Sequence, residues 1–192
     1  MTALTVNTKN RLQKALTSQG AANDLINNVQ KLHYVNTAAS TAISATSSET
    51  AFDTSYTIPA NTLRAGSVIK VRFQGIATAT NSTDTLTIKL YIGGLTGTAI
   101  FTSTATDATN NDIFAGEGII VIRTIGSSGT FVASGSYTKV EGASGSAARV
   151  DFVTASTAID TTTSKAVTAS ATWSTNSASN SCRMDIFAVE VY

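Results

Sequence analysis

The chain has 192 residues, of which 42% are hydrophobic and only 13% are charged, and its formal net charge is +1. This balance argues against a nucleic-acid-binding surface, because such binding depends on clustered Lys and Arg that displace counterions from phosphates. The single cysteine, Cys182, excludes an internal disulfide and a zinc site built from cysteines. The sequence contains neither a signal-peptide core nor a run that approaches the ~20 apolar residues of a membrane span. We therefore expect a protein that is made in a cytoplasm and does not act on a membrane.

Residues 1–33, called the leader below, have the pattern of two short amphipathic helices separated at Gly20, a residue type that commonly ends helices. Spacings of three and four residues predict one apolar stripe on each helix, formed by Leu12 and Leu16 and by Leu25, Ile26 and Val29. Two short helices bury too little apolar surface to fold alone, because ordering the backbone costs more free energy than these side chains recover. The stripes therefore need another surface, which is either the rest of this chain or a partner.

Residues 34–192 have the pattern of strands, and residues 33–37 are expected to form the hinge between them and the leader. Apolar and polar residues alternate with a period of two, which is typical of strands with one buried face. We expect strands at residues 41–44, 52–58, 69–74, 84–92, 99–104, 114–124, 130–140, 149–154, 165–173 and 182–192. About eight to ten strands with turns between them predict a mainly β domain, an antiparallel β-sandwich or jelly roll.

Residues 48–75 predict a strand, a turn and a second strand that share one apolar face. Pro59 ends the first strand because it has no N–H to give to a neighbouring strand, and Leu63 is expected to pack from the turn into the core. We expect the two strands to form a hairpin. Lys70 and Arg72, on the polar side of the second strand, are interpreted as a solvated or subunit-facing surface rather than an anion site.

Residues 119–122, Ile-Ile-Val-Ile, are apolar at every position. Such a run indicates a strand that is covered on both faces. We expect a neighbouring subunit to provide one of these covers, with Ile120 and Ile122 in the contact. Together with the low charge, which gives little protection against association, this run predicts a homotrimer.

The residues that carry reaction chemistry do not form a recognisable catalytic set. His33 is the only histidine, and no G-x-S-x-G motif accompanies it, so we expect no enzyme activity. Oxygen ligands between Asp107 and Asp112 could hold Ca²⁺, but their spacing does not match an EF-hand loop, and we expect no metal or cofactor. Cys182 and Trp173 lie in register with apolar neighbours, which favours buried positions over a reactive thiol and a sugar-stacking platform.

Three segments of the chain resemble structural proteins of tailed bacteriophages. Residues 48–75, SETAFDTSYTIPANTLRAGSVIKVRFQG, are the most specific of them. The end, SATWSTNSASNSCRMDIFAVEVY, is similar to the "ATWS…ASNS" close of the same proteins, and TKNRLQKALTSQGAANDLINNV resembles their short helical leader. Together the three segments cover about a third of the chain, and residues 95–147 resemble no family.

The resemblance implies a non-enzymatic virion protein with a jelly-roll-like β domain, of the capsid decoration (cement) type. Its implied partners are the major capsid protein on the outer surface of a phage head and further copies of itself. In that setting the apolar stripes of the leader would anchor the β domain to the capsid or to an adjacent copy. The alternative function is a receptor- or carbohydrate-binding module of a tail or head fibre. A hydrolase is a weaker alternative, because His33 would have to supply its triad.

Overall fold

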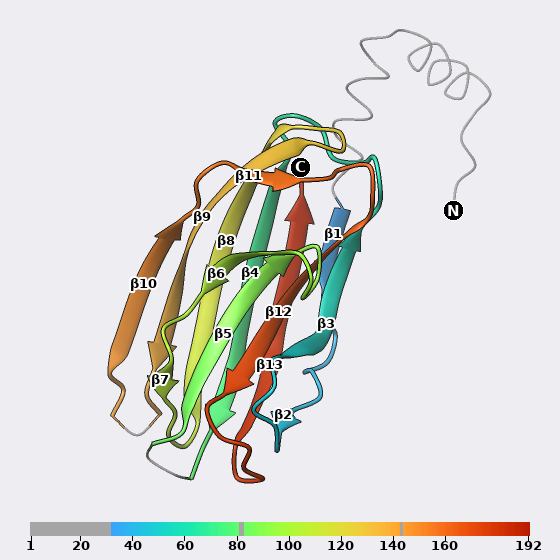
Figure 1. Ribbon diagram of the computed structural model, residues 1–192. Helices are drawn as coiled ribbons and strands as arrows, with labels where there is room; N and C mark the ends of the chain where they lie inside the picture. Colours follow the sequence, from blue (N-terminus) through green and yellow to red (C-terminus); the bar gives the residue numbers. More distant parts are fainter. Residues whose placement is uncertain (1–31, 81–82, 143) are drawn as a thin grey trace, which may run out of the picture.

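The computed structural model describes residues 32–80, 83–142 and 144–192 (Figure 1). Within these ranges the chain forms strands and no helix. The strands are β1 (Leu32–Val35), β2 (Ile43–Ser44), β3 (Thr50–Ile58), β4 (Val68–Thr78), β5 (Thr85–Ile92), β6 (Thr98–Thr102), β7 (Thr106–Asp107), β8 (Asp112–Thr124), β9 (Gly129–Val140), β10 (Ala147–Val153), β11 (Thr157–Ile159), β12 (Lys165–Trp173) and β13 (Ser181–Val191). The helical hairpin expected in the leader lies outside the described residues.

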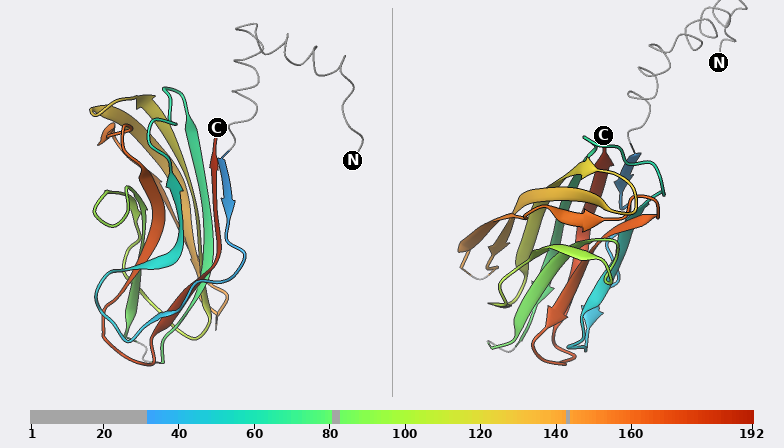
Figure 2. Two further views of the ribbon diagram at one scale, coloured as in Figure 1. Left: turned by 90° about the vertical axis from the view of Figure 1, so that its right-hand side faces the viewer. Right: turned by 45° about the horizontal axis from the view of Figure 1, so that its top comes forward.

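The strands form two antiparallel sheets that pack face to face (Figure 2). The large sheet has eight strands in the order β1-β13-β4-β8-β9-β10, with β2 beside β13 and β11 beside β9. The small sheet has five strands in the order β3-β12-β5-β6, with β7 beside β5. The antiparallel β-sandwich expected from the sequence is therefore confirmed.

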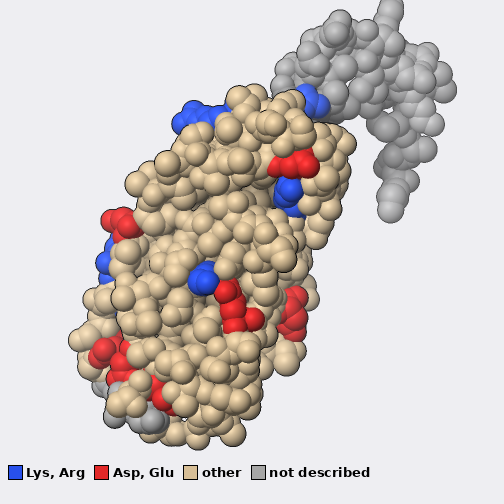
Figure 3. Space-filling model, viewed as in Figure 1, with Lys and Arg blue, Asp and Glu red and all other residues tan. Residues whose placement is uncertain are grey.

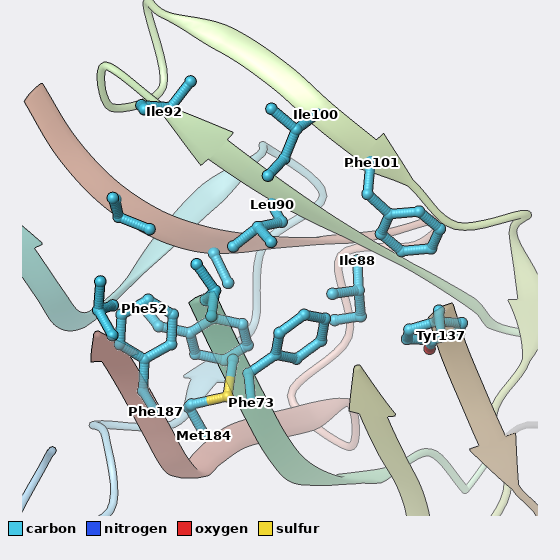
Figure 4. Packing of buried hydrophobic residues seen from close by; sticks show 14 of the residues in the cluster. Phe52, Phe73, Ile88, Leu90, Ile92, Ile100, Phe101, Tyr137, Met184 and Phe187 are labelled. Atoms are coloured by element: carbon cyan, nitrogen blue, oxygen red, sulfur yellow. The ribbon is translucent and has the colours of Figure 1, made fainter. Parts of the chain in front are cut away.

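The core lies between the sheets and follows the alternation in the sequence. In β4, Ile69, Val71 and Phe73 are at most 4% exposed, whereas Lys70 and Arg72 point to solvent. Aromatic rings also meet across the two layers. Figure 4 shows buried side chains converging from both sheets. Ring contacts between the sheets join Phe101 to Phe152 and Tyr137, Tyr34 to Tyr56, and Phe52 to Phe114.

Strands β3 and β4 do not pair with each other, so the hairpin expected over residues 48–75 is wrong. β3 pairs with β12 in the small sheet, and β4 lies between β13 and β8 in the large sheet. The turn itself behaves as expected. Asn61 adopts a positive φ, the Thr62 hydroxyl donates to the Pro59 oxygen at 2.7 Å, and Leu63 is 4% exposed. The connection crosses from one sheet to the other because both strands bury their apolar sides in the same core.

The hinge expected at residues 33–37 is also wrong, because β1 is a paired strand of the large sheet. His33 lies opposite Glu190 and Val35 lies opposite Ala188 in the β1–β13 register. The side chain of Asn36 continues this attachment: its Oδ1 accepts the Phe187 N–H at 2.6 Å. Among the described residues, the first strand begins at Leu32, within the range expected for the leader.

Candidate interaction surface

The structure tests only part of the interface expected from the sequence. The five leader residues proposed for a capsid contact, Leu12, Leu16, Leu25, Ile26 and Val29, lie outside the described residues. Ile120 and Ile122 are both 0% exposed and belong to the core of their own domain, so their assignment to a subunit contact is corrected. The other two residues of this run point outward, with Ile119 42% exposed and Val121 half-buried. At this strand the large sheet is covered on one face only. Ile119 and Val121 lie on its uncovered face.

In the loop proposed as a possible calcium site, the carboxylate of Asp112 forms an ion pair within the protein. Lys139 places its Nζ 2.9 Å from Asp112 Oδ2, and both side chains are at least nine-tenths buried. The same carboxylate accepts hydrogen bonds from the N–H and hydroxyl of Thr109 and from the N–H of Gly142. Burial alone would raise the pKa of Asp112, but these hydrogen bonds and Lys139 lower the pKa below its ordinary value. No cluster of three His, Cys, Asp or Glu side chains suited to a metal was found in the described ranges.

Cys182 and Trp173 are core residues, as expected from the sequence. Both are 1% exposed. Burial raises the pKa of the Cys182 thiol to about 12, which suppresses the nucleophilic thiolate. Trp173 contributes its Nε1 proton to the Ile43 oxygen at 3.4 Å instead of presenting a ring face to solvent.

A second polar cluster lies on the outward side of the small sheet. The Glu49 carboxylate accepts hydrogen bonds from Lys89 Nζ at 2.9 Å, from the Tyr91 hydroxyl at 2.7 Å and from the Ser170 hydroxyl at 2.7 Å. Desolvation would raise the pKa of Glu49, but these donors lower it. The cluster fastens the segment before β3 onto strands β5 and β12, and every polar group in it has a partner. Because these four side chains bond to one another, we interpret the cluster as a structural contact.

The outward side of the large sheet, called the outer face below, is the feature best suited to interaction. Cross-strand register places one residue from each of five strands in a row: Val35, Ala188, Arg72, Glu117 and Ser136. Two adjoining hollows meet at this row and share Arg72, Glu117 and Ala188. The floor around them consists of small residues, namely Ala115, Gly116, Gly118, Ser134 and Gly135.

Exposed apolar side chains lie within this row and beside it. Val35 and Ile186 are each 46% exposed, and Ile119 is 42% exposed. Neither Arg72 nor Glu117 forms a salt bridge with another described residue. The outer face therefore combines exposed apolar area, two opposite charges and hollows lined by small residues. This combination suits contact with a protein surface.

The small-sheet side carries few charged side chains (Figure 3). In the view of Figure 3, where the small sheet lies in front, charged side chains are few and scattered over a mostly uncharged surface.

In the part of the chain that the structure describes, no helix is long and apolar enough to span a membrane.

Comparison with known proteins does not place the chain in a family. No family model and no curated protein matches it. A chain in the structure of infectious bursal disease virus, Gx strain, is 15% identical with a TM-score of 0.37, and the match covers 84% of this chain and 32% of that one. Arcelin-5, a lectin-like defence protein from Phaseolus vulgaris, is 10% identical with a TM-score of 0.38, covering 71% of this chain and 76% of that chain. Winged bean acidic lectin is 9% identical with a TM-score of 0.38, covering 84% of this chain and 98% of that chain.

These values define neither a family nor a function, and this chain spans about a third of the viral chain that it matches.

The sequence predicted that Lys70 and Arg72 are solvated or subunit-facing, and both are exposed on the outer face. It missed Val35 and Ile186. The alternation in 182–192 could not reveal Ile186, because a β-bulge between Met184 and Ile186 shifts the register and turns this side chain outward.

Proposed function

We propose that this chain is a structural virion protein of the capsid decoration, or cement, type, whose jelly-roll-like β domain binds the outside of a phage head. Its partner is the major capsid protein, and it stabilises the contacts between neighbouring capsid subunits. The observation that carries the proposal is the outer face, on which exposed apolar side chains surround Arg72 and Glu117.

The chemistry of the outer face supports binding to protein. Complete burial of an exposed large apolar side chain contributes ~1.5–3 kcal/mol. Val35, Ile119 and Ile186 are each less than half exposed, so each can add roughly half of that value or less to a contact. Arg72 and Glu117 add orientation, because their opposite charges favour only a partner whose own charges match in position.

The position of the phage-like segments supports the virion assignment. Segment 48–75 contains most of β4 and segment 170–192 contains β13, and these two strands are neighbours at the centre of the outer face. Arg72 comes from the first segment and Ile186 from the second. The two stretches that resemble phage structural proteins therefore supply part of the surface proposed for binding, whereas Glu117 and Ile119 come from β8, which lies outside them.

The leader is proposed as a second attachment. Its last two residues belong to β1, which lies at one end of the described large sheet and places Val35 on the outer face. Two linked contacts bind more tightly than either alone, because the second is made at high effective concentration. In this arrangement the outer face and the leader stripes hold neighbouring capsid subunits together against the pressure of the packaged DNA.

A homotrimer was also expected from the sequence. Within the 119–122 run such a trimer would use Ile119 and Val121, because Ile120 and Ile122 are covered within their own domain.

The carbohydrate-binding alternative lacks a specific feature in its favour. Sugar recognition by stacking needs an exposed aromatic ring. All Phe, Tyr and Trp residues of the chain lie in the described ranges, and only Tyr192 among them is exposed. Lys70 places its Nζ 5.1 Å from the centre of that ring.

Binding to heads that lack the protein tests the proposal. Full-length protein is mixed with undecorated heads, and the bound fraction is measured by co-sedimentation over a range of concentrations. Ile119→Asp and Arg72→Glu should each weaken binding by about 10- to 100-fold, since each places a wrong charge in a desolvated contact. Thr57→Asp, on an exposed position of β3 in the small sheet, is the control and should bind like the wild type. Wild-type binding by both outer-face variants would show that this face is not the contact.

The leader is tested separately with Leu25→Asp in the full-length protein. As an anchor residue, Leu25 should be needed for head binding and not for the stability of the β domain. The thermal unfolding curve should therefore remain unchanged while binding falls. A lower Tm would assign the leader to the core of its own domain.

A further inference from the structure

Strand β10 is an edge of the large sheet, at the opposite end from β1 (Figure 1). It pairs with β9 on one side, and no described strand pairs with its other side. Six of its seven residues are exposed, and Phe152 is half-buried. An open edge of this length can accept another strand.

The hydrogen bond of Thr154, the residue after β10, shows which main-chain groups of β10 point toward the open edge. Thr154 donates its N–H to the Ala133 oxygen of β9 at 2.8 Å. Because main-chain groups alternate sides along a strand, Arg149, Asp151 and Val153 direct their N–H and C=O groups toward the open edge. These residues can therefore form ladder hydrogen bonds without disturbing the β9–β10 pairing.

The sequence of β10, Ala-Ala-Arg-Val-Asp-Phe-Val, is complementary to itself in antiparallel register. With a twofold axis at Val150, the partner of Arg149 is Asp151 of the second copy, and the partner of Asp151 is the second Arg149. Ala148 then lies opposite Phe152, and the two Val150 residues face each other. This register pairs every charge with its opposite and every apolar residue with another apolar residue.

The exposure of these side chains fits such a pairing. Val153 is 81% exposed and Val150 is 42% exposed, so both keep apolar area in contact with water in the single copy. Within one copy, Arg149 Nε lies 3.0 Å from Asp151 Oδ1, with the two side chains 64% and 73% exposed. An ion pair this exposed contributes little to stability and can be exchanged readily for pairs across a dimer axis.

We propose that two copies of this chain associate through antiparallel pairing of their β10 strands, which joins their large sheets into one continuous sheet. The occupant of the open edge is a second copy because the charges and the apolar residues match in the same register. The pairing leaves the outer face of both copies open for another partner.

Charge reversal on the full-length protein tests this register, with sedimentation velocity at micromolar concentrations as the measurement. The wild type should sediment as a dimer. Arg149→Asp and Asp151→Arg should each weaken the dimer at least 10-fold, because each creates two like-charge pairs across the axis. The double variant R149D/D151R restores opposite charges and should recover the dimer.

A matched control is available on β13, where Arg183 and Asp185 form the same kind of ion pair at 2.8 Å on a strand that is not an edge. Arg183→Asp should leave association unchanged. Amide hydrogen exchange gives a second measurement: the N–H groups of Arg149, Asp151 and Val153 should be protected in the wild type and exchange fast in the single variants.

Three results would overturn the proposal. They are a wild type that remains monomeric at tens of micromolar, an oligomer that both single variants preserve, and a double variant that does not recover the association. A trimer that is insensitive to all of these changes would place the self-contact elsewhere.

Discussion

The ring of Phe73 in β4 occupies the space that a side chain at Gly116 in β8 would need. The two residues are cross-strand partners, and a Cβ atom built on Gly116 would lie 2.3 Å from Phe73 Cζ. Phe114 lies over Gly75 in the same way, with its Cζ 2.3 Å from the position of a Cβ. These reciprocal pairs let two large rings lie flat against the large sheet and fill the core beside the small sheet.

The first prediction concerns this pair. Gly116→Ala should lower the free energy of unfolding by ~1–3 kcal/mol, because the buried ring of Phe73 must move to admit a methyl group. Gly118→Ala is the matched control, on the same strand and face, where the nearest atom would be Leu90 Cδ2 at 3.4 Å. Urea unfolding of both variants measures the difference. Equal stabilities would show that the ring is free to shift, and Phe73→Leu in the Gly116→Ala background should recover part of the loss.

The second prediction concerns the buried pair of Asp112 and Lys139. Asp112→Asn should lower the free energy of unfolding by about 3–5 kcal/mol at neutral pH, because it leaves the Lys139 ammonium buried without a counter-charge. The pKa of Asp112 is lowered in the folded protein, so its contribution to stability is present above its unfolded pKa, about 3.9, and is lost as the pH falls through the folded value. The difference between wild type and variant should therefore shrink below about pH 4. A difference that stays constant down to pH 2 would contradict this assignment.

The third prediction concerns the Glu49 cluster. Glu49→Ala should destabilise the fold by about 2–3 kcal/mol, because it leaves the hydroxyl of the fully buried Ser170 without an acceptor. Glu117→Ala is the control: Glu117 is exposed and has no salt bridge to a described residue, so the change should stay within about 0.5 kcal/mol. Chemical denaturation measures both. An equal effect of the two substitutions would mean that the cluster adds nothing to stability.

The fourth prediction concerns Cys182. Because burial raises its pKa to about 12, the native thiol should react with a disulfide reagent at pH 8 only when the protein unfolds. The labelling rate should therefore rise with denaturant in parallel with the unfolding rate. Fast labelling of the native protein without denaturant would place this thiol in a mobile part of the structure. Reductant should leave Tm unchanged, since a single cysteine cannot form an internal disulfide.

The sequence alone was sufficient for most of the strands and, outside the β-bulge of β13, for the side of each that faces the core, although it missed β1. In β12, Val167, Ala169, Ala171 and Trp173 were expected on one face, and all four are at most 1% exposed. This succeeds because side-chain direction alternates with each residue of a strand, so burial of one face leaves a period of two in the sequence. The turn at Pro59 and the burial of Leu63 were likewise local properties.

The tertiary structure alone decided which strands are neighbours. β3 and β4 carry the same alternation whether they pair in one sheet or face each other across the core, because in both arrangements their apolar sides meet the same interior. For the same reason the pattern at Ile120 and Ile122 could not distinguish a subunit contact from the core, and the open edge at β10 was invisible. Neighbours are chosen by long-range packing of the whole sandwich, which no local stretch of sequence records.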